Sequence, residues 1–229
     1  NPISWQTTVA SAGNLTSAVY RIFGKPFSEE GKKLFGVPFA QFLKLNSEFR
    51  YHYRIDKNQM IASRIAGGVI WSYGNATTAP YTEQFYIGGA NSVRAFSARS
   101  IGPGGYPPET DRKYTYINHV GDIRIEANIE YRFRMIADLH GAVFLDAGNV
   151  WLMRKDENRP NGEFTLKNFP KQIALGTGFG LRYDLDFLVF RLDLGIGLHD
   201  PYDTGKSGYY NIPKFKDSMA LHFAIGYPF

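Results

Sequence analysis

The most constraining feature of the sequence is an alternation of apolar and polar residues over long segments. Its clearest example lies within residues 117–133. The apolar face of this segment consists of Ile123, Ile125, Ala127, Ile129, Tyr131 and Phe133. The opposite face consists of Asp122, Arg124, Glu126, Asn128, Glu130 and Arg132. Because successive side chains of a β-strand point to opposite faces of a sheet, this period of two predicts a strand with one apolar and one charged face.

Seven further segments alternate in the same way, so the chain is predicted to be all-β with eight strands. The other expected strands are 3–11, 39–55, 59–73, 136–151, 172–183, 187–198 and 215–229. Long connections are expected at about 13–38, 74–114, 152–170 and 199–214, the first with room for a short helix; tight turns are expected at 56–58, 134–135 and 184–186. Long connections at one end of an antiparallel sheet and short turns at the other are typical of an outer-membrane β-barrel.

Strand length distinguishes a transmembrane barrel from a soluble one, whose faces have the opposite polarity. Strands of soluble sheets usually have about 5 to 6 residues, and segments 117–133 and 215–229 are far longer. A tilted strand of about 11 residues rises about 28 Å, enough to cross an apolar band of about 25 Å. The alternative, packing in a soluble core, would have to bury a row of mixed charges, which sits more easily in a wet lumen. The chain is therefore predicted to form an antiparallel transmembrane β-barrel.

Aromatic residues near the expected strand ends fit the interfacial girdles of such a barrel. They are Tyr51, Tyr53, Trp71, Tyr73, Tyr131, Phe133, Trp151, Tyr183 and Phe229. In a soluble fold the same residues would pack in the core. The inward charges elsewhere, including Glu48, Arg50, Arg124, Glu126, Arg191 and Asp193, are expected to line the lumen rather than form a site.

Composition excludes several classes of protein. The mean hydropathy is −0.28, and the chain lacks an apolar run of about 18 residues, which excludes a transmembrane helix. The net charge of +5 comes from basic residues spread along the chain, so nucleic acid is not an expected partner. The chain has no cysteine, its five histidines lack metal-ligand spacing, and no Ser/His/Asp set is placed at a strand end, so no metal, cofactor or enzymatic activity is expected. If the protein is exported, a start at Asn1 without a signal peptide indicates a mature or truncated piece.

One long segment, 85–106, has neither the period of a strand nor that of a helix. It reads FYIGGANSVRAFSARSIGPGGY, with glycines at both feet that allow tight turns. At its centre lie Val93, Arg94, Ala95 and Phe96. The segment resembles the loop 6 motif of the BamA/TamA outer-membrane assembly superfamily, a surface-antigen type of barrel, in which Val-Arg-Gly-Phe or Val-Arg-Gly-Tyr is flanked by Gly-Gly and Ile-Gly-Pro.

Other parts of the chain share this resemblance, which covers roughly residues 39–229. Segments 128–133 and 144–151 resemble the two strands that follow the loop in that family. The chain also ends on a C-terminal strand signal formed by Phe223, Ile225, Tyr227 and Phe229. Two departures stand out: Ala95 replaces the usual glycine, so the loop needs a backbone conformation that alanine can adopt, and Pro228 removes a ladder donor at the end of the last strand.

The resemblance implies a sixteen-stranded barrel, of which residues 1–229 would be the C-terminal portion, without periplasmic substrate-receiving domains. Whether eight strands close alone stays open, since eight is a permitted barrel number. The implied function is outer-membrane protein assembly, insertion or translocation, through an inward-folded loop and a lateral seam beside the last strand. The implied location is the bacterial outer membrane. The implied partners are outer-membrane lipids, unfolded outer-membrane protein clients and accessory assembly proteins.

Within the family, the loop arginine pairs with inward carboxylates, which by motif position are Glu130 and Asp146 here. The alternation supports this, because both carboxylates lie on the polar face of adjacent expected strands and one guanidinium can bind two carboxylates. The alternative is that Arg94 is a solvated loop residue. For the whole protein, the alternatives are a passive channel or surface antigen, and a transporter dedicated to a single partner.

Three glycines in one expected strand, Gly176, Gly178 and Gly180, have a spacing superficially like that of a phosphate-binding loop. They fall in mid-strand on the inward face. Missing side chains there are expected to leave room for a loop rather than to bind a nucleotide.

Overall fold

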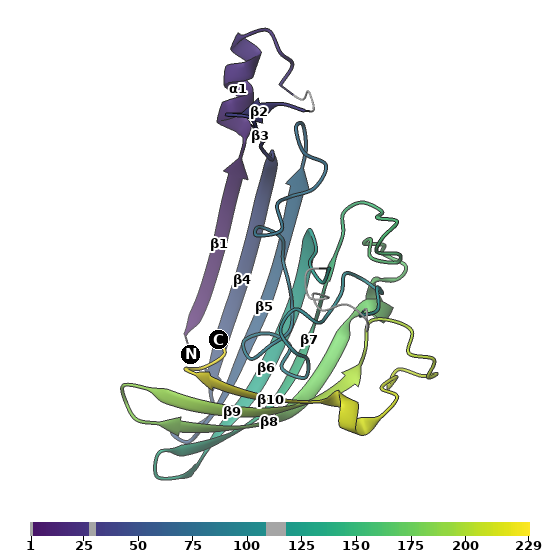
Figure 1. Cartoon of the computed structure of the whole chain (residues 1–229). Helices are drawn as coiled ribbons and strands as arrows, with labels where there is room; N and C mark the ends of the chain where they lie inside the picture. The colour runs from purple at the N-terminus through teal and green to yellow at the C-terminus, as the bar shows by residue number, and fades with distance from the viewer. Residues whose placement is uncertain (1, 28–30, 109–117) are drawn as a thin grey trace.

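The computed structural model describes residues 2–27, 31–108 and 118–229. Eight strands form one antiparallel sheet in which each strand pairs with the next along the chain (Figure 1). Their bounds are β1 (Ile3–Ala12), β4 (Phe42–Arg54), β5 (Gln59–Ser72), β6 (Ile123–Ile136), β7 (Leu139–Trp151), β8 (Ala174–Asp184), β9 (Val189–His199) and β10 (Met219–Ile225). The predicted all-β, antiparallel, eight-stranded architecture is confirmed.

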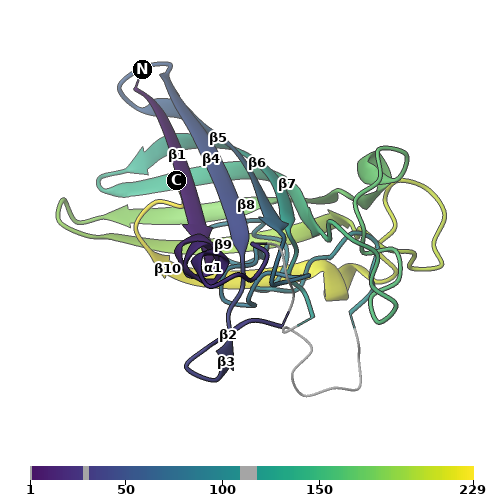
Figure 2. The same cartoon turned by 90° about the horizontal axis from the view of Figure 1, so that it is seen from above.

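The sheet is strongly curved, and the part of the β5–β6 connection that precedes residue 109 lies on its concave side (Figure 2). Strands β1 and β10 are the two ends of the sheet, and no ladder between them is present in the described part of the chain. The sheet is thus an open arc rather than a closed barrel. The long connections gather at one end of the strands and the short turns at the other, as predicted (Figure 1).

Small elements decorate the long connections. The first contains helix α1 (Asn14–Ile22) and a hairpin of β2 (Lys33–Leu34) and β3 (Val37–Pro38), which stand beyond the end of β1 (Figure 1). Two short 3₁₀ helices, η2 (Phe169–Gln172) and η3 (Phe215–Ser218), precede β8 and β10. Among the residues described, no helix combines the length and apolar character needed to cross a membrane.

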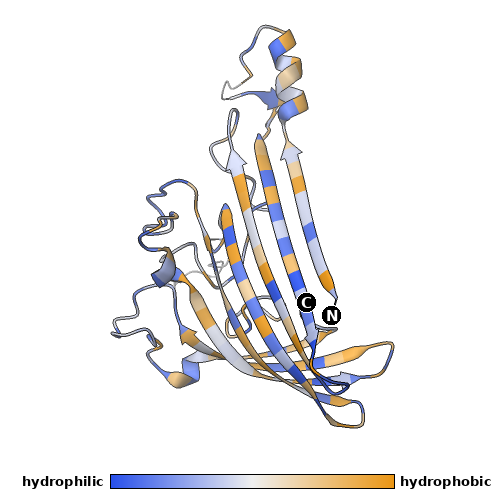
Figure 3. Cartoon of the chain, turned by 180° about the vertical axis from the view of Figure 1, so that it is seen from behind, coloured by the Kyte–Doolittle hydropathy of each residue, from blue (hydrophilic) through white to orange (hydrophobic). Residues whose placement is uncertain are grey.

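The outer and inner faces of the sheet have the polarity of a membrane barrel. In β6, Glu130 is fully buried, whereas the side chains beside it, Ile129 and Tyr131, are 46% and 36% exposed. The same alternation appears as blue and orange bands along the strands in Figure 3. A water-soluble protein would bury the apolar face instead. The inverted arrangement requires an apolar surrounding, which confirms the transmembrane over the soluble prediction.

The hairpin between β6 and β7 corrects the expected turn at 134–135. Strand β6 continues to Ile136, with a register shift between Arg134 and Ile136. The chain turns at Ala137, whose φ is 47°. The extra residue of this irregularity extends the strand past the point where the alternation ends, which a strict period of two does not reveal.

The start of β6 also differs from the prediction. The strand begins at Ile123 rather than at 117, a residue that lies outside the described ranges. The side chain of Asp122 accepts hydrogen bonds from Gln84 Nε2 at 3.0 Å and from the Met153 backbone N–H at 3.1 Å. This carboxylate therefore ties neighbouring loops together at the edge of the strand.

The last strand is much shorter than the expected 215–229. Strand β10 has only 7 residues, because η3 occupies its expected start and the chain leaves the ladder at Gly226, where φ is 82°. Glycine adopts this conformation without the strain that a side chain would bring. Phe223 and Ile225 point outward, 68% and 62% exposed, but Phe229 is buried at 8% exposure. The expectation that the outward face continues to Phe229 is therefore wrong, and Tyr227, which is 39% exposed, lies beyond the end of β10.

Candidate functional site in the concave face

Segment 85–108 is fixed against the inner face of the sheet. Both sides of the segment pack into a small apolar core together with strand residues. This core consists of Phe42, Ile70, Ala79, Phe85, Ile87, Val93, Ile101, Val150 and Ala174. Phe85 also forms an isolated antiparallel bridge with Gly121. The tip is a compact turn, in which Gly89 N–H donates to the Phe96 carbonyl at 2.9 Å and Phe96 N–H donates to the Val93 carbonyl at 3.1 Å. The loop therefore has one defined position over the strands.

Arg94, at the tip, reaches two carboxylates on neighbouring strands. Its Nε and Nη2 donate to the two oxygens of Asp146 on β7, at 2.8 and 2.9 Å. Its Nη1 donates to Glu130 on β6, and its backbone N–H donates to Asp146 at 3.0 Å. The Phe144 ring centroid lies 3.6 Å from Cζ of the guanidinium. All three charged side chains are fully buried, so the structure brings together the three residues that the sequence singled out.

Two charge-assisted bonds to one carboxylate fix the plane of the guanidinium as well as its position. Burial by itself would lower the pKa of Arg94, but hydrogen bonding to Asp146 and the charges of Asp146 and Glu130 outweigh it and raise the pKa. Arg94 is therefore a cation in the folded protein.

The network around Glu130 is larger than the sequence indicated. Arg132 Nε and Arg182 Nη2 also donate to the Glu130 carboxylate, at 2.7 and 3.1 Å. Arg182 then pairs with Asp193 at 2.6 Å, and Arg191 lies 3.4 Å from the same carboxylate. The alternation in the sequence predicts that these arginines face inward. It does not predict which carboxylates they contact. Removing one charged side chain of this network would leave its partners buried without a compensating charge, which lowers the stability of the folded protein.

The glycines of β8 and β9 make room for the loop tip. A Cβ added to Gly176 would overlap the Cβ of Ala95, and one added to Gly195 would overlap the Arg94 carbonyl. Of the three glycines for which the sequence predicted this role, only Gly176 makes room for the loop. The space at Gly178 is taken by Phe144 and the Leu194 carbonyl, and the space at Gly180 by the side chains of Arg182 and Asp193. Ala95 fits there without a left-handed backbone: the non-glycine residues with positive φ in the described ranges are Phe35, Arg99, Ala137, Asn161 and Asp186.

The end of the chain folds into the same region. The Phe229 ring centroid lies 5.3, 6.0 and 5.7 Å from the guanidinium carbons of Arg64, Arg94 and Arg132, and Tyr227 lies 4.5 Å from that of Arg132. On β10, His222 Nε2 lies 2.9 Å from the Arg94 carbonyl oxygen. Sequence reasoning assigned no role to His222. The sequence feature that could have identified His222 is its position on the inward face of the strand, since its neighbour Phe223 faces outward.

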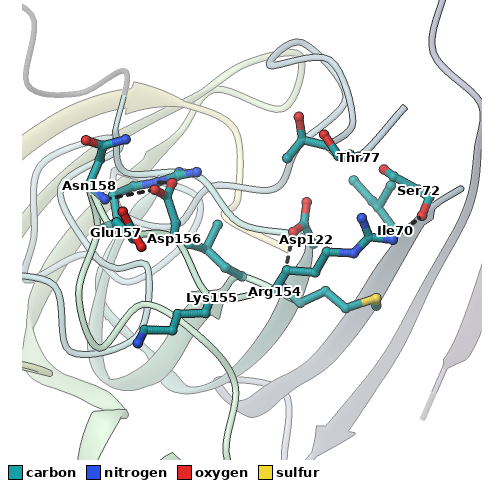
Figure 4. A pocket seen from close by; sticks show the side chains of 13 residues that line it. Ile70, Ser72, Thr77, Asp122, Arg154, Lys155, Asp156, Glu157 and Asn158 are labelled. Carbon is teal, nitrogen blue, oxygen red and sulfur yellow. Dashed lines mark hydrogen bonds and ion pairs between the residues drawn. The ribbon is translucent and has the colours of Figure 1, made fainter. Parts of the chain in front are cut away.

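A separate cavity of about 440 Å³, lined by both polar and apolar side chains, lies between the long connections (Figure 4). Arg154 donates to the Ser72 carbonyl at 3.2 Å on one side, and Arg159 donates to Asp156 at 2.8 Å on the other. The hydrogen bond from Arg159 lowers the pKa of Asp156. Within residues 2–27, 31–108 and 118–229, no group of three or more His, Asp or Glu side chains could hold a metal ion.

Comparison with known proteins gives consistent matches. Residues 33–229 match the family model described as the Omp85 superfamily domain. Over 204 residues the chain is 28% identical to the outer membrane protein assembly factor BamA of Nitratidesulfovibrio vulgaris, covering 87% of this chain and 22% of that protein. Over 89 residues it is 29% identical to the protein of the same name in Neisseria meningitidis serogroup B, covering 37% and 11%. The chain thus spans about a fifth of the length of the first relative.

A solved structure shows the same fold. The crystal structure of BamA from Haemophilus ducreyi lacking POTRA domains 1–3 matches with a TM-score of 0.54 and 16% identity. The match covers 81% of this chain and 35% of that one.

Proposed function

The chain belongs to the Omp85 superfamily, and on that basis we propose that it takes part in the assembly or insertion of other outer-membrane proteins. Its location is the bacterial outer membrane. In this proposal residues 1–229 are the C-terminal portion of a sixteen-stranded barrel, and β10 forms one side of a lateral seam. Client strands would add to the exposed edge of that seam by β-augmentation. The proposed partners are lipids, unfolded clients and accessory assembly proteins, and no catalytic step is assigned.

The observation that carries this proposal is the burial of Arg94 between Glu130 and Asp146. A loop held by a fully buried ion-pair network occupies the concave side of the sheet. A passive channel or surface antigen does not need a loop in a preferred position. The pairing of a buried guanidinium with two carboxylates, however, requires one defined geometry of the loop tip. The loop position therefore favours the assembly function over the passive alternative.

A transporter dedicated to one partner would use the same loop, so a cellular experiment must distinguish it from a general insertase. We expect depletion of the protein, followed by a census of outer-membrane proteins, to show a general loss of β-barrels. Loss of one exported protein alone would support the dedicated transporter. An unchanged census would contradict both.

Complementation within the same experiment tests the loop. Wild type should restore the census, whereas Arg94→Glu should not, because it places a third carboxylate beside Glu130 and Asp146. Protease should then cut segment 85–108 in the variant and not in the wild type. Arg99→Glu is the matched control, since Arg99 lies in the same loop and contacts the rings of Tyr81 and Tyr86 instead. Unchanged protease protection in Arg94→Glu would refute the role of the ion pairs.

A further inference from the structure

We propose that His222 is a positioning residue that couples the tip of the 85–108 loop to the last strand, β10. The contact is between the imidazole Nε2 of His222 and the backbone carbonyl oxygen of Arg94, at 2.9 Å. A carbonyl oxygen can only accept, so Nε2 carries the proton and donates. The consequence for the seam rests on the function proposed above, whereas the contact itself does not.

His222 is the one polar side chain on the inward face of β10. Along Met219–Ile225 the inward residues are Ala220, His222 and Ala224, and the outward residues are all apolar. Within this fully described strand, His222 makes the one side-chain hydrogen bond. Any attachment of β10 to the loop through a hydrogen bond from its side chains therefore passes through this imidazole.

The loop backbone comes close to the sheet at the point where His222 can reach it. Gly195 on β9 pairs with Ala220 on β10. A Cβ at Gly195 would overlap the Arg94 carbonyl, so the absence of a side chain lets that carbonyl approach the two strands. Arg94 consequently bridges two parts of the sheet. Its guanidinium holds β6 and β7, and its carbonyl holds β10.

Strand β10 depends on such a contact more than the other strands. It has 7 residues, against 13 in β4 and 14 in β5, and its only ladder in the described chain is with β9. A short edge strand opens locally at a low free-energy cost. A docked loop would therefore keep β10 closed, and an undocked loop would release it as one side of the seam.

The test is hydrogen–deuterium exchange of the β10 amides in the protein reconstituted in liposomes. Losing one hydrogen bond should speed exchange of residues 219–225 by about two- to tenfold in His222→Ala. His222→Gln keeps an amide donor near the position of Nε2, so its exchange should return to within about twofold of wild type. His140→Ala is the control, because His140 lies on β7 and its Nδ1 has no hydrogen-bond partner among the described residues. Wild-type exchange in His222→Ala, or equally fast exchange in His222→Gln, would overturn the proposal.

A second background tests the coupling itself. In Arg94→Ala the loop tip loses its ion pairs, so adding His222→Ala should change β10 exchange no further. Additive effects of the two substitutions would show that His222 acts independently of the loop and would overturn the proposal. Because exchange is measured without a client, its outcome is separate from that of the depletion experiment. Normal coupling with an unchanged census would remove the assembly function and leave the contact in place.

Discussion

At the scale of single residues, the loop tip and the sheet fit by size as well as by charge. Ala95 fills the space left by Gly176, and the carbonyl of Arg94 fills the space left by Gly195. Protein interiors are packed so closely that one added methyl group lowers the stability of the fold. The ion pairs select the partner strands, and the missing side chains select how closely the loop approaches them.

Gly176→Ala should displace the loop tip, because the new methyl group would overlap that of Ala95. We expect a loss of about 1 to 3 kcal/mol in the free energy of unfolding, measured by urea titration in detergent micelles. Ala95→Gly should restore most of the loss in the double variant by removing the opposing methyl group. An equal loss in both backgrounds would show that the two residues do not compete for this space.

The sequence located some members of the ion-pair network but not others. Alternation alone puts Glu130 and Asp146 on inward faces, and the motif position of Arg94 suggested where that side chain would go. The convergence of Arg132 and Arg182 on Glu130 depends on the register between strands and on the curvature of the sheet. A single sequence contains neither. The role of the network in assembly stays a prediction.

At the scale of elements, the strand count and the chain order were predictable, and the strand ends were less so. The period of two persists along β6 to β9 because one face meets lipid and the other the lumen. It persists equally past Ile225, through Tyr227 and Phe229, although the chain has already turned at Gly226. The backbone conformation of one glycine ended β10, and side-chain pattern carries no information about it.

The connection between β7 and β8 should loosen in acid. Its Asp156 accepts from Arg159 at 2.8 Å, and this bond holds the pKa of the carboxyl below its ordinary value. A depressed pKa in the folded state stabilises the loop above about pH 4, and the contribution is lost as the pH falls through the folded pKa.

Amide exchange in residues 152–168 should therefore rise between neutral pH and about pH 3, after correction for the intrinsic pH dependence of exchange. In Arg159→Gln the corrected rates should be higher at neutral pH and nearly independent of pH. Equal pH dependence in wild type and variant would show that another group is responsible.

At the scale of the whole molecule, the sheet has two free ends. Strand β1 pairs only with β4 in the described structure, and its Ile3 and Trp5 side chains are 65% and 76% exposed. A free strand edge presents unpaired backbone donors and acceptors. In a bilayer such groups must be satisfied, which is why spanning strands occur in closed barrels. In a membrane the two edges of the arc must therefore be paired, whether with each other, with further strands or with a second copy.

Amides on the free edge of β1 should exchange rapidly in the isolated chain in detergent and slowly in the sixteen-stranded protein proposed above. The central strands β5 and β6 serve as the internal control, because both already have two neighbours and should change little. The comparison can be made by mass spectrometry of peptides covering residues 3–12. Full protection of β1 in the isolated chain would show that eight strands close alone or associate with a second copy.

The inverted polarity of the sheet also makes solubility depend on folding. With every second residue polar, the unfolded chain has a mean hydropathy of only −0.28 and presents no continuous apolar surface. Pairing of the strands sorts the same residues into an apolar outside and a charged inside. The continuous apolar surface therefore forms only as the strands come together. Folding away from a membrane would expose that surface to aggregation, so folding and membrane entry must occur at the same place.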